Sequence, residues 1–235
     1  MACDSHGKNW KAGSFGNFVK GLNLLLHDGS IIYCDGAVNS SIFYASIGGM
    51  GLTGIILDVK LELKKVTSSY LDVETVRLNN LKELFDLQNE TIDSHEYLFT
   101  WIDSHKIGRN MGRSILQRAN HSKSKELIYK TKKSIPIPYM PSFAINQYSV
   151  ELFNFAYYLS VGNKPKNNKM YITDYFYPLD GLDNWNRLYG RKGFLEYQVV
   201  IPSTSAYETI YELLSRITRS KLASFIAAIK PLSKS

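Results

Sequence analysis

The sequence predicts an α+β protein, and three observations support this fold class. Segments 55–63 and 194–201 show the two-residue alternation of side chains that is typical of strands. Segment 74–87 and the stretch after Pro202 show the spacing of apolar residues that is typical of helices. These candidates do not follow one another in a regular strand–helix–strand order, so a doubly wound parallel sheet is not expected.

The composition is that of a globular protein with one large domain or two small ones. The chain has 235 residues, of which 44% are hydrophobic and 21% are charged. Cys3 and Cys34 do not have the spacing of a metal site, so we expect neither a metal ion nor a disulfide framework. No apolar run is long enough to span a membrane, and the first residues do not resemble a signal peptide. We therefore expect a cytoplasmic protein and leave open whether it associates with a membrane surface.

The net charge of +7 has two interpretations. It indicates either attraction to phosphate groups or simply well-solvated loops, and we favour the second. No nucleic-acid-binding module accompanies the charge, so no nucleic-acid partner is expected. The lysines concerned are Lys123, Lys125, Lys130, Lys132, Lys133, Lys164, Lys166 and Lys169.

The N-terminal part of the chain predicts a hairpin followed by a helix. Strands at 22–26 and 30–34 flank Asp28-Gly29, and Asp-Gly suits a tight turn. Residues 39–45 predict a short helix that stops at Gly48-Gly49.

Segment 55–63 predicts a half-buried strand of an antiparallel or mixed sheet. A polar run at 67–69 then marks a boundary, so we expect one domain at 1–66 and another at 67–235. The residues expected on the buried face of the strand are Ile55, Leu57, Val59, Leu61 and Leu63.

The second domain is expected to mix helices and strands. Segment 74–87 predicts a helix, and segments 97–103 and 169–177 predict strands. The prolines of segment 135–141 exclude a helix interior and predict an extended loop.

Segment 194–201 predicts a further strand, with Glu196 and Gln198 on one face. Ser205 and Glu208 have the spacing of a capping box at the start of the helix that follows.

The run from Gly49 to Gly54 matches the dinucleotide-binding pattern G-x-G-x-x-G. That motif follows a strand and opens a helix, whereas here a helix is expected before the run and a strand after it. The glycines therefore form either a tight helix-to-strand turn or a place where backbone approaches a flat ligand closely.

Several short motifs that are weak alone form a specific combination. They are His6-Gly7-Lys8-Asn9, Ala12-Gly13-Ser14-Phe15-Gly16-Asn17, the run 43–56, Trp101, Tyr175-Phe176-Tyr177-Pro178-Leu179-Asp180 and the run 193–202. The combination resembles the C-terminal part of the PCMH-type FAD-binding domain of the vanillyl-alcohol-oxidase superfamily, followed by part of the antiparallel-sheet substrate domain. Within that superfamily it most resembles the oxidase subunits of decaprenylphosphoryl-β-D-ribose 2′-epimerases.

The resemblance implies an FAD-dependent oxidoreductase acting on CH–OH groups. Such an enzyme oxidises a hydroxyl of a sugar or of a polyprenyl-phosphate pentose, and hydride passes to the flavin. The residues implied to contact FAD are Cys3, Asp4, Ser5, His6 and Ile56. The residues implied to contact the substrate are Lys8, Trp101, Phe176, Glu196 and Gln198.

The chain departs from the family pattern in ways that leave the substrate open. Trp10-Lys11 stands where a His pair is usual, Glu196 stands for a common Gln, and Phe176 stands for a common Tyr. The family's glycine-rich pyrophosphate loop is not in this sequence, and the family's active-site Lys and Cys are expected beyond Ser235, so no catalytic residue is assigned.

We therefore expect a fragment that is truncated at both ends. The alternative is a non-catalytic remnant or binding module that has lost FAD. The expected partners are the sugar substrate, a short-chain reductase, and a separate chain that supplies the missing N-terminal half.

Overall fold

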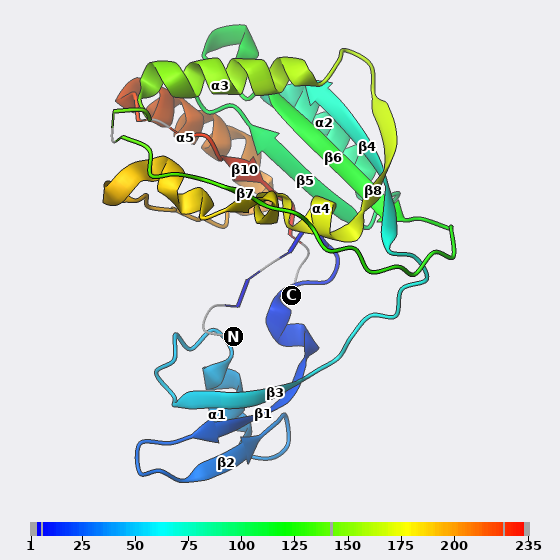
Figure 1. The fold of residues 1–235 in the computed structure, drawn as a ribbon, viewed down its shortest axis with the longest axis vertical. Coiled ribbons are helices and arrows are strands. Elements are labelled where there is room, and N and C mark those ends of the chain that lie inside the picture. The colour runs from blue at the N-terminus through cyan, green and yellow to red at the C-terminus, as the bar shows by residue number, and fades with distance from the viewer. Residues whose placement is uncertain (1–3, 6, 142, 223, 233–235) are drawn as a thin grey trace. The chain divides into compact units, whose positions relative to one another are not determined.

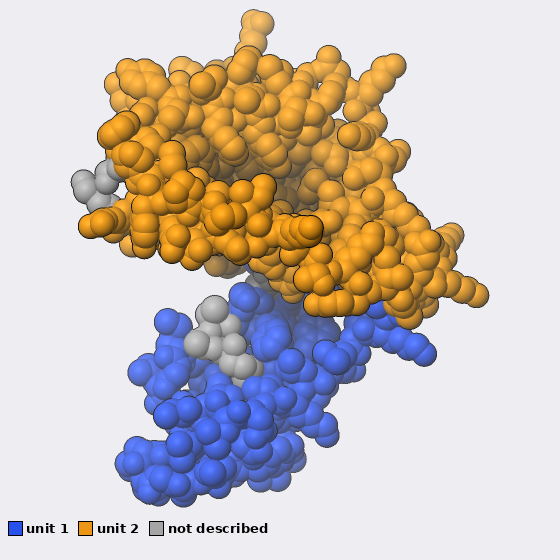
Figure 2. Space-filling model, viewed as in Figure 1, with its two compact units in different colours: residues 1–66, 231–235 blue, residues 67–230 orange. Residues whose placement is uncertain are grey.

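The computed structural model describes residues 4, 5, 7–141, 143–222 and 224–232. The chain forms two compact units, one of Met1–Val66 with Pro231–Ser235 and one of Thr67–Lys230 (Figures 1 and 2). The main division thus lies between Val66 and Thr67. Whether the two units are a flavin domain and a substrate domain stays a prediction.

The first unit is a three-stranded antiparallel sheet with one short helix. Its elements are η1 (Phe15–Phe18), β1 (Val19–Leu25), β2 (Ile31–Cys34), α1 (Ser40–Ser46) and β3 (Ile55–Leu61). The sheet order is β2-β1-β3. The predicted hairpin is confirmed, since Leu25 pairs with Ile31 across a turn in which Gly29 has a φ of +83°. The predicted short helix is also confirmed, shifted by one residue.

The core of the first unit lies between β1, β2 and α1. Leu22, Leu24 and Cys34 are buried there, together with Phe43 of α1. Burial raises the pKa of the Cys34 thiol, so the thiol stays protonated at neutral pH.

The predicted buried face of β3 is only partly correct. A bulge separates the pairs Asp58–Asn23 and Ile56–Leu24, and it breaks the two-residue alternation. Ile56 and Val59 pack against the core as a result, while Ile55 and Leu57 are exposed.

The second unit is built on a five-stranded antiparallel sheet with the order β10-β5-β6-β4-β8. Its strands are β4 (Tyr70–Leu78), β5 (Tyr97–Ile102), β6 (Ser114–His121), β8 (Lys166–Tyr171) and β10 (Ala228–Ile229), and β7 (Ile135–Pro136) pairs separately with β9 (Leu182–Asp183). Its helices are α2 (Leu81–Thr91), η2 (Gly108–Asn110), α3 (Gln147–Ser160), α4 (Ile172–Phe176), η3 (Pro178–Gly181), η4 (Trp185–Lys192), η5 (Ser203–Ser205) and α5 (Ala206–Ser220). Helices mixed with antiparallel strands confirm the α+β class.

The helices of the second unit cover both faces of its sheet (Figure 1). Gln88 of α2 donates a hydrogen bond to Thr100 on one face. Tyr158 of α3 packs against Trp101 and Ile115 on the other face. Thr100 and Trp101 are adjacent residues of β5, so their side chains point to opposite faces of the sheet. Helices α2 and α3 therefore cover opposite faces.

Two predicted elements in this unit are wrong in part. Residues 74–78 of the predicted helix belong to β4, and the helix begins only after Asn80, whose side chain accepts a hydrogen bond from the Glu83 amide. Residues 172–176 of the predicted strand form α4.

The predicted strand at 194–201 is not part of any sheet in the described chain. Its alternation is real, but Leu195 is fully exposed and Tyr197 is 83% exposed, because no neighbouring strand pairs with the segment. The predicted capping box is also not formed. Ser205 stands at the N-cap position of α5, but its side chain makes no capping hydrogen bond.

Candidate functional site

The motif residues of the first unit are held together by backbone contacts. The Gly16 amide donates a hydrogen bond of 2.7 Å to the Asp4 carboxylate, and the Phe15 amide donates to the Ser5 carbonyl at 3.0 Å. The segment around Asp4 and the loop 12–17 therefore lie against each other. Cys3 and His6 lie outside the described residues.

Glycines bring a third segment to the same place. A Cβ on Gly48 would come within 3.3 Å of the Asp4 Cβ, and a Cβ on Gly16 would come within 2.5 Å of Ile47. The run after Gly48 leads directly from α1 into β3, so the interpretation as a tight helix-to-strand turn is confirmed. Gly16 and Gly48 thus allow these segments to pack closely against Asp4 and Ile47.

Lys8 and Ile56 occupy different parts of the first unit. Lys8 is half-buried in the N-terminal segment. Ile56 packs its side chain against the core from β3, which is an edge strand of the sheet. On its outer side, an edge strand leaves N–H and C=O groups that pair with no other strand. A backbone contact from β3 to a ligand would be made by these groups.

In the second unit, Trp101 is buried and fixed in orientation. Its indole N–H donates a hydrogen bond of 3.0 Å to the carbonyl oxygen of Phe225. The ring of Tyr157 packs edge-on against it, with 4.9 Å between the ring centroids. The Trp101 side chain is 5% exposed and belongs to the core of the unit.

Phe176 lies on the same sheet face as Trp101. Its ring packs edge-on against Tyr97 at 5.0 Å, and Tyr97 stands four residues before Trp101 on β5. Burial raises the pKa of Tyr97 and of neighbouring Tyr175, so both phenols are neutral at physiological pH.

Glu196 and Gln198 are exposed in the segment that the sequence predicts as a strand. Aromatic contacts link the start of this segment to Trp101. The Phe194 ring lies 4.5 Å from that of Tyr189, and Tyr189 lies 6.2 Å from Phe225, whose carbonyl binds Trp101. The second unit therefore connects Phe194, at the start of the segment, to the aromatic cluster around Trp101, while Glu196 and Gln198 have no place in that cluster.

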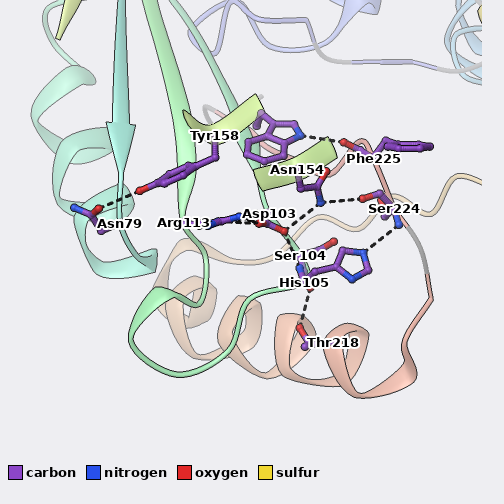
Figure 3. Close-up of polar contacts among 11 residues, drawn as sticks. Asn79, Asp103, Ser104, His105, Arg113, Asn154, Tyr158, Thr218, Ser224 and Phe225 are labelled. Carbon is purple, nitrogen blue, oxygen red and sulfur yellow. Dashed lines mark hydrogen bonds and ion pairs between the residues drawn. The ribbon is translucent and has the colours of Figure 1, made fainter. Parts of the chain in front are cut away.

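A buried ion pair lies at the end of β5, and sequence reasoning missed it (Figure 3). Arg113 binds one carboxylate oxygen of Asp103 through Nε at 2.8 Å and Nη2 at 2.7 Å. Asn154 of α3 and the His105 amide donate to the other oxygen, at 3.1 and 3.0 Å. The guanidinium of Arg113 also lies 4.5 Å over the ring of Tyr158.

This cluster joins the segments around Trp101. The Ser224 amide donates to His105 Nε2 at 3.3 Å, and the Thr218 hydroxyl donates to the Ser104 carbonyl at 2.8 Å. Both contacts fasten the C-terminal part of the unit to the loop that follows β5 (Figure 3). The one signal in the sequence is an Asp placed directly after the apolar strand 97–102.

Comparison with known proteins identifies a relative that covers nearly all of the chain. The chain is 30% identical to the decaprenylphosphoryl-β-D-ribose oxidase of Mycolicibacterium smegmatis over 98% of its own length. The predicted resemblance is confirmed: this chain is a homologue of that oxidase. It spans about half the length of the oxidase, with 52% covered.

A second relative matches a shorter part of the chain. It is a Streptomyces coelicolor protein described as an uncharacterized protein in the mprA 5′ region, with 31% identity over 52% of this chain and 33% of that protein. No model of a known protein family matches the chain. Among the described residues, no helix is long and apolar enough to cross a membrane.

Proposed function

We propose that this chain is part of an FAD-dependent oxidoreductase that oxidises a hydroxyl group of a sugar or of a polyprenyl-phosphate pentose. The observation that carries the proposal is the match to the mycobacterial oxidase over 98% of the chain. In this proposal, Met1–Val66 is the C-terminal part of a PCMH-type FAD-binding domain, and Thr67–Lys230 is part of the substrate domain.

The surface around Asp4 fits an extended nucleotide cofactor. Asp4, Ser5, Gly16 and Gly48 come together so closely that added Cβ atoms at the glycines would meet their neighbours. This packing holds the loop 12–17 and the start of the run after α1 against the segment that carries Asp4 and Ser5. The residues proposed to hold FAD are Cys3, Asp4, Ser5, His6 and Ile56.

FAD, when bound, supplies the hydride acceptor, and this chain's own residues orient the substrate. Trp101, which is 5% exposed and bonded to Phe225, is the proposed apolar base of the substrate site. Phe176 extends that base, while Glu196 and Gln198 offer hydrogen-bonding groups to hydroxyls. Lys8 is the proposed substrate contact from the first unit.

A binding module without redox activity is the second candidate. It is favoured by the exposure of the 194–201 segment, where Glu196 and Gln198 are not held in a sheet. This candidate predicts binding of a sugar phosphate without transfer of electrons.

The proposed partners follow from the same resemblance. A short-chain reductase would complete a two-step epimerisation, and a separate chain would supply the rest of the flavin domain. Association with a membrane surface is supported by α3, which carries Tyr148, Leu152 and Leu159 exposed.

The test is to join this chain to the part of the mycobacterial oxidase that it does not cover. We expect a yellow protein with the visible spectrum of bound flavin, and reduction of a dye when a phosphorylated pentose is added. A folded but colourless protein would refute the proposal, and a yellow protein without dye reduction would favour the binding module.

A further inference from the structure

The positive charge of the chain is concentrated in two stretches of the second unit, 122–133 and 161–171. Together they contain eight lysines and one acidic residue, Glu126, which gives them a charge of +7. This equals the net charge of the whole chain, so the remaining residues are neutral in sum. Charge gathered in this way creates a local positive potential that attracts anionic partners. The lysines are Lys123, Lys125, Lys130, Lys132, Lys133, Lys164, Lys166 and Lys169.

The fold places the two stretches side by side. Lys169 of β8 binds the Glu126 carboxylate, with 3.2 Å between Nζ and the oxygen. The ammonium groups of Lys130 and Lys169 lie over the same ring, that of Tyr70, at 5.1 and 4.9 Å from its centroid. Seven of the eight lysines are exposed, and Lys132 is half-buried. The two stretches therefore form one basic surface, which we call the lysine surface.

Most of the charge of the lysine surface is not neutralised within the unit. Glu126 binds Lys169, and Asp174 binds Lys132 at 2.9 Å. The other six lysines form no ion pair in the described part of the chain. Their charge is therefore available to a partner with negative charge.

Apolar side chains stand among these lysines. Leu127, Ile128 and Tyr129 are 65%, 44% and 88% exposed. Their backbone is held in place, because the Ser69 amide donates a hydrogen bond to the Glu126 carbonyl at 2.8 Å and the Ile128 amide donates to the Ser69 hydroxyl at 3.0 Å. Apolar side chains that stay exposed together on a held backbone indicate a contact surface.

Protection of an edge strand explains only part of the lysine surface. β8 is an edge strand of the five-stranded sheet, and lysines on such a strand hinder its pairing with other chains. This reason applies to Lys166 and Lys169. It does not apply to the lysines of the loop 122–133, nor to Leu127 and Tyr129, because exposed apolar side chains favour association.

We propose that the lysine surface binds an anionic lipid bilayer, with its lysines against the headgroups and with Leu127 and Tyr129 where headgroups meet acyl chains. Lysines strengthen binding to anionic lipids, and tyrosine is favoured at this depth because its ring has an apolar body and a polar tip. A nucleic acid would also bind the lysines, but it gives no reason for the exposed leucine. The inference rests on the membrane association in the proposed function and assigns it to a surface other than α3.

The test is sedimentation of the full chain with phosphatidylcholine vesicles that contain about one third phosphatidylglycerol, and with phosphatidylcholine vesicles alone. We expect binding to the anionic vesicles only, and loss of that binding at high salt, which screens exposed charges. A triple variant, Lys123→Gln, Lys125→Gln and Lys133→Gln, should bind roughly tenfold more weakly or worse, since each lysine near an anionic membrane contributes about fivefold.

The matched control removes the same charge from exposed positions on α2 and at the end of α5. This triple variant, Lys82→Gln, Arg219→Gln and Lys221→Gln, should weaken binding by less than about threefold. Leu127→Ser with Tyr129→Ser should weaken binding to anionic vesicles by roughly fivefold or more, and should leave binding to a single-stranded oligonucleotide unchanged. Circular dichroism confirms that each variant is folded.

Four results would overturn the inference. Equal losses in the two triple variants would show a general effect of charge. An oligonucleotide that binds more tightly than the anionic vesicles, through the same lysines, would assign the surface to nucleic acid. Loss of vesicle binding only in Leu152→Ser with Leu159→Ser would assign the membrane contact to α3 and leave the proposed association standing. No binding to anionic vesicles at low salt would remove the surface and the membrane association together, and would leave the flavin test above unaffected.

Discussion

Replacing Asp103 with asparagine leaves the guanidinium of Arg113 buried without a counter-charge. The side chains of Arg113 and Asp103 are 8% and 0% exposed, so water cannot compensate for the loss. Removing one partner of such a pair typically costs about 3–5 kcal/mol. The ring of Tyr158, 4.5 Å from the guanidinium, remains as a partner, so we expect the lower end, about 3 kcal/mol.

A melting experiment measures this cost. For a domain of this size, about 3 kcal/mol corresponds to a loss of roughly 6–12 °C in melting temperature. The matched control is Asp86→Asn, which breaks an exposed pair with Lys82 and should cost less than about 1 kcal/mol. If Asp103→Asn has the same melting temperature as Asp86→Asn, the buried pair does not carry the expected cost.

Three other outcomes are expected. Asn80→Ala should lower the free energy of unfolding in urea by about 1 kcal/mol, because the Asn80 side chain accepts a hydrogen bond from the Glu83 amide at the start of α2. Asn89→Ala, on the exposed face of α2, should not lower it. Equal effects of the two changes would contradict the cap. Cys34 should resist alkylation in native Cys3→Ser protein and react fully in denaturant, because burial raises its pKa; rapid native labelling, followed by mass spectrometry, would contradict its burial. The pKa of His95 should lie below its ordinary value of 6.5 by NMR titration, because desolvation and then Arg118 disfavour its charged form. The unfolded chain then binds the proton more readily than the folded chain, so His95 should lower the free energy of unfolding as the pH falls below about 6.5. If a His95→Gln variant shows the same change in the free energy of unfolding with pH, this explanation is contradicted.

Local patterns were enough to predict elements whose signals come from neighbouring residues. Asp28-Gly29 marked the hairpin because the turn depends on its own two residues. The strand predicted at 97–103 is found at 97–102, and five of its six positions are buried.

Other features depend on contacts that a local pattern does not contain. The predicted helix, whose spacing rests on Leu81, Leu84 and Phe85, does not reach back over 74–78, because pairing of β4 with β6 draws those residues into the sheet. The alternation of 194–201 predicts a strand, but a strand also needs an edge to pair with, and none is provided in the described chain.

The candidate site shows the same division. The contacts of Asp4 and Ser5 with the loop 12–17 agree with motifs that the sequence contains. The Asp103–Arg113 pair could not be predicted, because neither residue belongs to a sequence pattern and the Asn154 that completes the pair comes from a distant helix. Pairing of charges across elements is a property of the fold and not of spacing.

The most direct test of the proposed function is the visible absorption spectrum of this chain when it is joined to the part of the mycobacterial oxidase that it does not cover. We predict bound flavin, and its loss when Gly16→Val forces the loop away from Ile47, where a Cβ would already lie at 2.5 Å. A control change, Gly162→Val, where a Cβ meets nothing within 4 Å and φ is not positive, should leave the flavin spectrum in place. A joined protein that folds and contains no flavin would contradict the account.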